Sequence, residues 1–348
     1  ESVLAQTFDP FEIFLIDDAS QDDSPHIAHA FTKKHKNIFL IQHTSNRGPG
    51  AARNTGIEAA RGSFLAFLDG DDLMHSTCLD RQMFFFLTHP ETDVLYTALK
   101  VVDERGKEIA FLEGQKERRE NFFPLMLFRN QIPGPGNIVA KKSVFLQNRY
   151  PEERKHGEDY ALMLRLAEQG YCFSYFNEPL YGYRRHTHNL SNQIDQHQKS
   201  EEEILIDYPL CKLEAAVAAS SFAQEDKILL LGKILWNQCH FEMAAQKFSS
   251  LVSEEAYFYL GNYWLKQQDP EKAISFFEKA CVASSPNPAI FNNKGVALAR
   301  LGREEEARVC FYKALSLSPT YLDAQRNLSL QESPPNMLAV TPRFLRSR

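Results

Sequence analysis

The chain has 348 residues, with 39 Lys and Arg against 45 Asp and Glu and a formal net charge of −6 at pH 7. This balance argues against a nucleic-acid binder, because no basic surplus is present to neutralise phosphates. Apolar residues make up 43% and charged residues 24%, as in folded globular proteins, and the length allows two domains. The six cysteines form no CxxC pair, which argues against a zinc cluster.

The N-terminal half of the chain alternates short apolar runs with helical stretches. Residues 11–16, 37–42 and 63–68 predict strands, and residues 22–35 and 49–61 predict the helices between them. Continuous apolar strands that alternate with helices are typical of a mostly parallel sheet covered on both faces. The sequence therefore predicts an α/β domain.

Three further elements are predicted later in this half. Residues 94–102 and 108–111 flank the sequence ERGK at 104–107, which is typical of a hairpin turn. Residues 157–169 predict a helix, and Gly170 suits its C-terminal end.

Acidic and glycine-rich segments follow the first two predicted strands. Asp17 and Asp18 end the first strand, where open α/β sheets bind ligands and where carboxylates can accept hydrogen bonds from a base or a ribose. Asn46 and Gly48 belong to a turn that enters the second helix, with Arg53 one turn further on. Backbone amides at such a helix N-terminus can face an anion. Helix capping and turn formation are the structural alternatives.

The third predicted strand ends in Asp69-Gly70-Asp71-Asp72. Three neighbouring carboxylates repel one another unless a positive group is bound among them. Mg²⁺ commonly takes one or two carboxylates together with phosphate oxygens. The pattern predicts a divalent-cation site, and an acidic turn without a ligand is the alternative.

Five segments together resemble family 2 glycosyltransferases with the GT-A fold. They are DDAS at 17–20, NRGPGAARN at 46–54, FLDGDD at 67–72, HGEDYALMLRLAEQGY at 156–171 and EPLYGYRRHTHNLS at 178–191. The resemblance covers residues 1–191 and implies transfer of a sugar from a nucleotide sugar, most simply a UDP-sugar, with inversion. The acceptor it implies is a surface polysaccharide, a lipid-linked glycan or a protein.

The resemblance also implies a role for each matching residue. For the donor nucleotide these are Asp17, Asp18, Asn46, Gly48, Arg53, Asp69 and Arg185. For Mn²⁺ or Mg²⁺ they are Asp71, Asp72 and His186. Asp159 matches the family's general base, with Glu158 beside it, and a carboxylate there can accept the proton of an attacking hydroxyl. Two acidic residues in the first turn of a helix are also favoured by its dipole alone.

From about residue 212 the strand pattern ends and an internal repeat begins. Four positions recur at one constant interval: Gly261, Ala273, Phe277 and Ala280 are followed by Gly295, Ala307, Phe311 and Ala314. An earlier copy has three of these positions, at a slightly shorter interval: Gly232, Ala244 and Phe248. Small residues recur where paired helices approach closely, and aromatic residues fill the space between them. The constant interval resembles that of the tetratricopeptide repeat, whose period is 34, and three units are about the minimum for a stable stack.

The sequence thus predicts a GT-A domain at 1–191, a helical linker at 192–224, repeats with a capping helix at 225–332 and a flexible tail at 333–348. Members of the family begin with a strand before the helix that matches residues 1–7, so we expect a strand upstream of the printed sequence. The repeats are expected to bind a protein or to form a homodimer. Residence in the cytoplasm is expected, with basic residues of the tail (Arg343, Arg346 and Arg348) in contact with the inner membrane face.

Two other functions fit parts of the sequence. A catalytically silent sugar-nucleotide-binding or scaffold protein would act through its repeats, but it would not need both Asp71 and Asp159. A sugar-phosphate nucleotidyltransferase would share the nucleotide-binding half, but the Glu158-Asp159 helix favours transfer to an acceptor.

Overall fold

The computed structural model describes residues 1–134, 136–187, 189, 194–206, 208–283, 287–330 and 335–344. The chain divides into two compact units, Glu1–Ser221 and Phe222–Arg348. Over the described ranges, no helix is both long enough and apolar enough to cross a bilayer.

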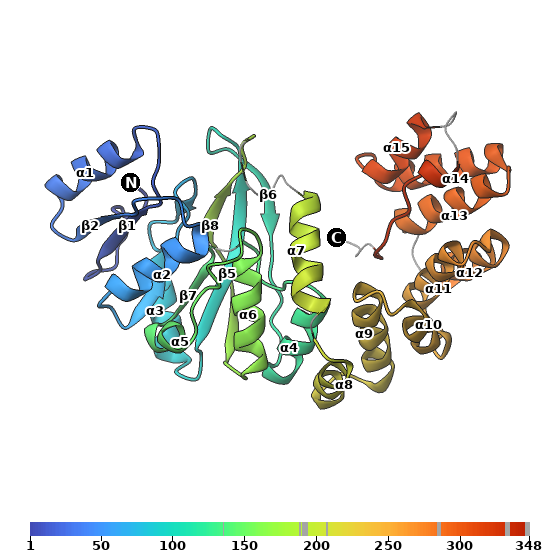
Figure 1. Cartoon of the computed structure of the whole chain (residues 1–348), viewed down its shortest axis with the longest axis horizontal. Coiled ribbons are helices and arrows are strands. Elements are labelled where there is room, and N and C mark those ends of the chain that lie inside the picture. Colours follow the sequence, from blue (N-terminus) through green and yellow to red (C-terminus); the bar gives the residue numbers. More distant parts are fainter. Residues whose placement is uncertain are drawn as a thin grey trace. The chain divides into compact units, whose positions relative to one another are not determined.

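The first unit is an α/β domain with two sheets (Figure 1). Its strands are β1 (Ile13–Asp17), β2 (Ile38–Gln42), β3 (Phe64–Ala66), β4 (Leu73–Met74), β5 (Val94–Val102), β6 (Glu108–Leu112), β7 (Ile138–Lys141) and β8 (Phe173–Arg184). Its helices are α1 (Ser24–Lys34), α2 (Pro49–Ala59), α3 (Cys78–Thr88), α4 (Arg119–Phe128), α5 (Lys142–Gln147), α6 (Glu158–Glu168), α7 (Ile194–Ile206) and α8 (Leu210–Ala219). Apart from the helix expected at residues 1–7, the strands and helices predicted from the sequence are present, within a few residues at each end.

The prediction of one mostly parallel sheet is wrong. β1 and β2 pair in parallel with each other, and the larger sheet has the order β3-β7-β5-β8-β4, with β6 also on β5. Within this sheet β5 and β8 are parallel, whereas β7, β6 and β4 run antiparallel to their neighbours. Apolar runs indicate that a strand is buried, but they do not fix its direction, because burial on both faces is compatible with either pairing.

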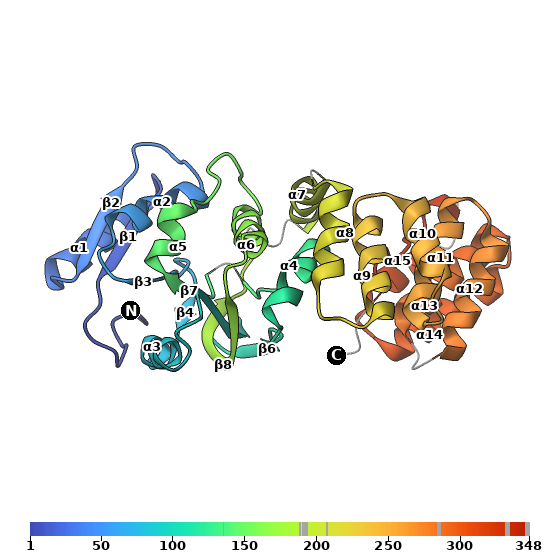
Figure 2. The same cartoon turned by 90° about the horizontal axis from the view of Figure 1, so that it is seen from below.

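β5 is the centre of the larger sheet, with eight of its nine residues buried. α6 crosses in front of the sheet in Figure 1 and lies on one face of it in the view turned by 90° (Figure 2). Tyr160, Leu162 and Leu164 of α6 are almost fully buried. Gly157 precedes the helix at φ 71° and Gly170 follows it at φ 78°, left-handed conformations that favour glycine. This packing fixes the N-terminus of α6, where Glu158 begins the helix.

The predicted linker at 192–224 is helical in its described part, but its helices belong to the first unit. α8 packs against α4, and Ser221 donates a backbone hydrogen bond to Asn121 of α4 at 2.8 Å. Leu213 and Val217 of α8 are buried. Residues 1–7, expected to be helical, form turns instead.

The second unit consists of paired helices. They are α9 (Gln224–Asn237), α10 (Phe241–Ser249), α11 (Glu254–Lys266), α12 (Pro270–Ala283), α13 (Pro288–Arg300), α14 (Glu304–Leu317) and α15 (Leu322–Ser329). Within this unit α9 packs against α10, α11 against α12, and α13 against α14. The predicted repeating glycines lie at these crossings, each beneath the aromatic ring of its own unit.

The glycine of each repeat is required by close packing. A Cβ atom at Gly232 or Gly295 would come within 2.6 Å of the ring of Phe248 or Phe311, and one at Gly261 would overlap the ring of Phe277. Phe277 is fully buried and has no room to move aside. The recurrence of these glycines therefore records a helix–helix contact rather than a chemical site.

Gly261→Ala is expected to destabilise the second unit by about 1–2 kcal/mol. Overpacking costs about 1–3 kcal/mol, which exceeds the gain of about 0.5–1 kcal/mol that alanine brings to a helix interior. Both tryptophans of the chain, Trp236 and Trp264, lie in this unit, so urea unfolding followed by their fluorescence measures the change. Gln246→Ala, at an exposed position of α10, is the control and should leave the transition unchanged. An equally stable Gly261→Ala variant would contradict the packing argument.

In its described part, the tail that the sequence predicts to be flexible packs on the repeat helices. Residues 335–344 begin with a 3₁₀ turn at Pro335–Met337, and Leu338 and Thr341 are buried at 9% and 4% exposure. Polar side chains of the repeat helices bind the backbone of this segment, which a reading of composition alone does not reveal. Arg346 and Arg348, expected to contact a membrane, lie outside the described residues.

Candidate active site

The carboxyl ends of β1 and β2 form one edge of the small sheet, with Asp17 opposite Gln42. The Asp17 carboxylate accepts hydrogen bonds from the Ser20 backbone N–H at 3.1 Å and from the Gln42 side-chain amide at 3.3 Å. The hydrogen bonding by Ser20 lowers the pKa of Asp17 below its ordinary value. Asp17 is therefore an ionised carboxylate at an accessible strand end.

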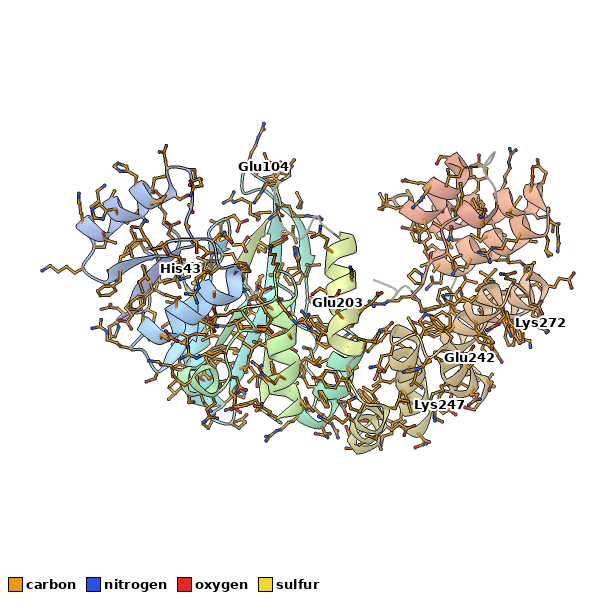
Figure 3. All side chains as sticks on the ribbon, in the orientation of Figure 1. His43, Glu104, Glu203, Glu242, Lys247 and Lys272 are labelled. Atoms are coloured by element: carbon orange, nitrogen blue, oxygen red, sulfur yellow. The ribbon has the colours of Figure 1, made fainter. Side chains whose placement is uncertain are left out.

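Asp18 holds the loop that enters α2. Its carboxylate contacts His43 Nδ1 at 2.6 Å and accepts the backbone N–H groups of Arg47 at 2.9 Å and of Gly48 at 2.7 Å. His43, which is labelled in Figure 3, also contacts Thr55 of α2 through its other ring nitrogen, at 2.9 Å. Burial alone would raise the pKa of Asp18, but these hydrogen bonds outweigh it and lower the pKa.

The predicted Asn46 and Gly48 belong to this same loop. The Asn46 side-chain amide donates to the Asp18 carbonyl at 3.3 Å. Gly48 has φ 88° and directly precedes α2. The amides at the start of α2 are thus oriented by Asp18 from the end of β1, which places the loop beside Asp17.

Asp18→Asn is expected to lower the unfolding free energy of the first unit by about 1–3 kcal/mol at pH 7, because bonds to a charged acceptor are lost. The folded pKa lies below the ordinary value of 3.8. The stabilisation is therefore fully present above pH 3.8 and is lost as the pH falls through the folded pKa.

Urea unfolding of both proteins between pH 3 and pH 7, followed by far-ultraviolet circular dichroism, measures this difference. Asp22→Asn, at a fully exposed carboxylate of the same strand-to-helix loop, is the matched control. A difference between Asp18→Asn and wild type that stays constant down to pH 3 would contradict the assignment.

Arg53 is a buried cation that joins two predicted parts of the site. Its guanidinium donates to Asp69 Oδ1 at 3.0 Å and to Glu158 Oε1 at 2.6 Å. Its side chain is 10% exposed, and its Cζ lies 5.4 Å from the centre of the Tyr150 ring. Burial disfavours the charge, but Asp69 and the neighbouring acidic residues raise the pKa of Arg53 above its ordinary value.

Glu158 and Asp159 occupy the first turn of α6 beside this cation. Burial and then the charge of Asp159 raise the pKa of Glu158, and the ion pair with Arg53 acts in the opposite direction. Asp159 is half-buried, and within the described residues no hydrogen-bond or ion-pair partner is found for its carboxylate. The two neighbouring carboxylates therefore differ in their contacts: Glu158 forms an ion pair with Arg53, and Asp159 does not.

A second set of contacts fixes α2 to the segment before α6, and the sequence did not predict it. The Asn54 side chain donates to the Tyr150 carbonyl at 2.9 Å and accepts the Tyr150 N–H at 2.9 Å. Glu152 accepts from Asn54 at 3.0 Å and from Arg47 at 2.8 Å. The helix that carries Arg53 and the loop that leads to Glu158 are thereby locked together.

Asp71 and His186 lie side by side. His186 Nε2 is 2.9 Å from Asp71 Oδ2, and the Asp71 carboxylate is 43% exposed. Arg184 at the end of β8 donates its Nε–H to the Asp71 carbonyl at 2.8 Å. Arg185 donates its backbone N–H to Val102 at 2.8 Å, and its side chain is exposed.

Asp72 is buried and bonded on both oxygens. Tyr181 donates its hydroxyl to Oδ2 at 2.5 Å, and Arg184 donates its backbone N–H to Oδ1 at 2.8 Å. Burial raises the pKa of Asp72 to about 6. In this arrangement Asp72 fastens the acidic loop to β8.

The donor set suits one divalent cation held by few protein ligands. Asp71 offers a carboxylate oxygen and His186 an imidazole nitrogen, a pair that Mn²⁺ accepts. Mg²⁺ and similar ions take one or two protein ligands when phosphate oxygens and water supply the rest. Over the described ranges, no group of three or more His, Cys, Asp or Glu side chains converges on a common point, so a ligand set confined to protein side chains is not formed there.

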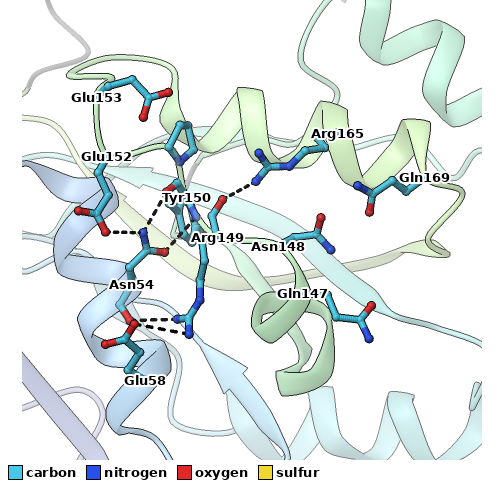
Figure 4. A pocket seen from close by; sticks show the side chains of 11 residues that line it. Asn54, Glu58, Gln147, Asn148, Arg149, Tyr150, Glu152, Glu153, Arg165 and Gln169 are labelled. Atoms are coloured by element: carbon cyan, nitrogen blue, oxygen red, sulfur yellow. Dashed lines mark hydrogen bonds and ion pairs between the residues drawn. The ribbon is translucent and has the colours of Figure 1, made fainter.

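A polar hollow of about 600 Å³ is lined in part by Asn54 and Tyr150 (Figure 4). Gln147, Arg149, Glu153 and Arg165 also line it. None of the predicted site residues is among those that line it. The candidate site is therefore defined by its charged contacts and not by this hollow.

The comparisons with known proteins agree with this architecture. Residues 1–144 match the Glycosyl transferase family 2 model, and residues 254–284 and 288–321 match tetratricopeptide repeat models. The chain therefore contains a family 2 glycosyltransferase domain followed by tetratricopeptide repeats. Both resemblances and the predicted fold class, an α/β GT-A domain with an all-α repeat domain, are confirmed.

Curated relatives match the same half of the chain. A glycosyltransferase of Rickettsia felis is 35% identical over 176 residues, which cover 49% of this chain and 27% of that protein. The poly(ribitol-phosphate) beta-glucosyltransferase of Bacillus spizizenii is 31% identical over 176 residues, 44% of this chain and 27% of that protein. The chain thus spans about a quarter of the length of either relative. Among solved structures, S. aureus TarS 1-349 is similar with a TM-score of 0.48 and 18% identity, over 92% of this chain and 86% of that one.

Proposed function

We propose that this chain carries the catalytic domain of an inverting glycosyltransferase that moves a sugar from a nucleoside-diphosphate sugar to an acceptor hydroxyl. The observation that carries the proposal is the bridge made by Arg53. It joins Asp69, beyond the end of β3, to Glu158, beside Asp159. The proposed donor side and the proposed base are thus gathered about one buried cation.

On the donor side, Asp17 is the carboxylate proposed to accept hydrogen bonds from the base or ribose. Asp18, Asn46 and Gly48 are proposed to hold the loop so that amides at the start of α2 face the donor. Asp69 is proposed to accept a ribose hydroxyl with its remaining oxygen. Arg185, in the segment after β8, is proposed to contact the diphosphate, where a cation stabilises the charge of the leaving group.

Asp71 and His186 would hold Mn²⁺ or Mg²⁺. The ion, when bound, would neutralise charge on the diphosphate oxygens. Asp72, proposed from the sequence as a further ligand, is bonded to Tyr181 and Arg184. We assign it the task of keeping Asp71 in place.

The reaction proposed is a direct displacement. The acceptor oxygen forms a bond to the anomeric carbon as the bond from that carbon to the phosphate oxygen breaks. The nucleoside diphosphate leaves with the bonding electrons, and the hydroxyl proton passes to the Asp159 carboxylate. One displacement inverts the anomeric centre, and no covalent bond between sugar and protein is needed.

The acceptor class is proposed from the relatives. The Bacillus spizizenii protein, by its name, acts on poly(ribitol-phosphate), which supports a bacterial surface polymer as the acceptor. A UDP-sugar is the first donor to test. The donor sugar and the acceptor are separate unknowns, so they are tested separately.

Asp71→Ala is expected to abolish the metal-dependent part of donor binding. Calorimetric titration of UDP, GDP and dTDP in Mn²⁺ and in EDTA measures it, and the nucleotide that binds best then defines the panel of sugar donors. Hydrolysis or transfer from that panel by the wild type tests the function itself. Asp80→Asn, at an exposed acidic residue of α3, is the control and should bind as the wild type does.

Three results discriminate among the candidate functions. Turnover of a nucleotide sugar supports the proposal. Metal-dependent binding without turnover, in the presence of polymer and lipid-linked acceptors, favours the silent sugar-nucleotide-binding protein. Formation of a nucleotide sugar from a sugar phosphate and a nucleoside triphosphate favours the nucleotidyltransferase.

A further inference from the structure

Four asparagines form a buried row across the repeat helices. Asn262 lies on α11, Asn292 and Asn293 on α13, and Asn327 on α15, each at most 2% exposed. Asn293 and Asn327 are separated by the repeat interval, the same as that from Gly261 to Gly295, and so occupy equivalent positions in successive units. Side-chain amides are costly to bury unless they are hydrogen-bonded, so this row requires partners.

Some of these partners are other asparagines of the row, and the rest belong to the chain's own residues 339–341. Asn293 accepts the Thr341 N–H at 2.8 Å and donates to the Thr341 carbonyl at 2.8 Å. Asn327 does the same for Ala339, at 2.6 Å and 2.9 Å. In a β-strand the N–H and C=O of residues i and i+2 point to the same side. The two asparagines therefore bind the segment as a neighbouring strand would.

The other contacts strengthen the same mode of binding. Asn262 donates to the Thr341 carbonyl at 3.0 Å, and Asn292 donates to the Ala339 carbonyl at 3.0 Å. These contacts are made to the main chain, which every polypeptide shares. The row is therefore suited to an extended polypeptide of many sequences.

Two side-chain contacts add selectivity. The Thr341 hydroxyl donates to Asp323 Oδ2 at 2.7 Å. The Phe344 ring packs edge-on against Phe258, with ring centres 5.4 Å apart. A ligand of this row would thus be an extended segment with a hydroxyl residue and, three positions later, an aromatic residue.

We propose that the asparagine row is a polypeptide-binding site and that residues 338–344 (LAVTPRF) occupy it as a displaceable intramolecular ligand. The pairs α11–α12 and α13–α14 pack through their glycine–phenylalanine crossings, contacts in which this segment takes no part. Release of the segment would leave the asparagines bonded to one another but would remove all their hydrogen bonds to main chain, so a second polypeptide of the same chemistry takes its place. The proposal goes beyond the glycosyltransferase function and does not depend on it.

The test uses a fluorescein-labelled peptide with the sequence of residues 338–344. Its anisotropy is titrated with the full chain and with a chain that ends at Leu330. The shortened chain is expected to bind at least about tenfold more tightly, because a tethered ligand competes at a millimolar effective concentration. Asn293→Ala in the shortened chain is expected to weaken binding about tenfold, since two hydrogen bonds are lost. Gln246→Ala in the same chain is the matched control and should bind unchanged.

Equal affinities of the full and shortened chains would overturn the proposal. So would failure of a shortened chain with wild-type helical circular dichroism to bind the peptide. Thr341→Pro in the full chain provides a second route, because it removes the N–H that Asn293 accepts and leaves the tail attached. It is expected to raise peptide affinity over the wild type, and a folded variant that still excludes the peptide would show that the segment is a fixed part of the repeat unit.

Discussion

Asp159→Asn is expected to reduce sugar transfer by about 10²–10⁴-fold, the usual contribution of a positioned general base, and to leave donor binding unchanged. The amide keeps the size of the carboxylate but cannot take the proton of the attacking hydroxyl. Asp159 makes no hydrogen bond or ion pair within the described residues, in contrast to Glu158, which is bonded to Arg53. The substitution should therefore remove chemistry without disturbing the fold.

Single-turnover transfer measured at saturating donor separates this effect from binding. Asp80→Asn is again the control, because Asp80 also lies in the first turn of a helix and is exposed. It reproduces the loss of a helix-dipole interaction without the loss of a base. Retained transfer by Asp159→Asn would end the base assignment and return Asp159 to the role of a favourable helix-terminal charge.

The sequence predicted the local elements of the first unit better than their assembly. β1, α2 and α6 each have a rhythm or an end signal within their own residues, such as the glycines around α6. The pairing of β3 with β7 and the antiparallel neighbours of β5 depend on contacts between residues far apart in the chain. No periodicity within either segment records such contacts, so the prediction of a mostly parallel sheet was wrong.

The candidate site likewise contains residues that the sequence predicted and residues that it did not. Asp17 and Asp69 could be proposed because they follow strand ends, and Asp159 because it begins a helix. Tyr150 under Arg53 and Tyr181 on Asp72 carry no such signal, since an isolated tyrosine is compatible with any packed core. His43 could have been noticed, because it directly follows β2, at the same sheet edge as Asp18. The asparagine row was hidden because its partner segment looks featureless in composition.

Arg53→Ala is expected to destabilise the first unit by about 3–5 kcal/mol, the usual cost of removing one partner from a buried ion pair. The substitution leaves the Glu158 carboxylate buried without its cation, in addition to freeing Asp69. Because burial and Asp159 already raise the pKa of Glu158, loss of the cation raises it further. The donor side and the start of α6 also lose their link, so donor binding should fall with stability.

Hydrogen exchange of the α2 and α6 amides measures this loss in the first unit, and tryptophan fluorescence follows the second unit in the same sample, because Trp236 and Trp264 both lie there. The tryptophan transition should not move. Arg61→Ala is the matched control, since the Arg61 side chain is 75% exposed in its pair with Glu12 and surface pairs contribute at most about 1 kcal/mol. Equal effects of the two substitutions would mean that the buried bridge does not hold the two parts of the site together, and the shared-site argument for Asp69 and Asp159 would lose its basis.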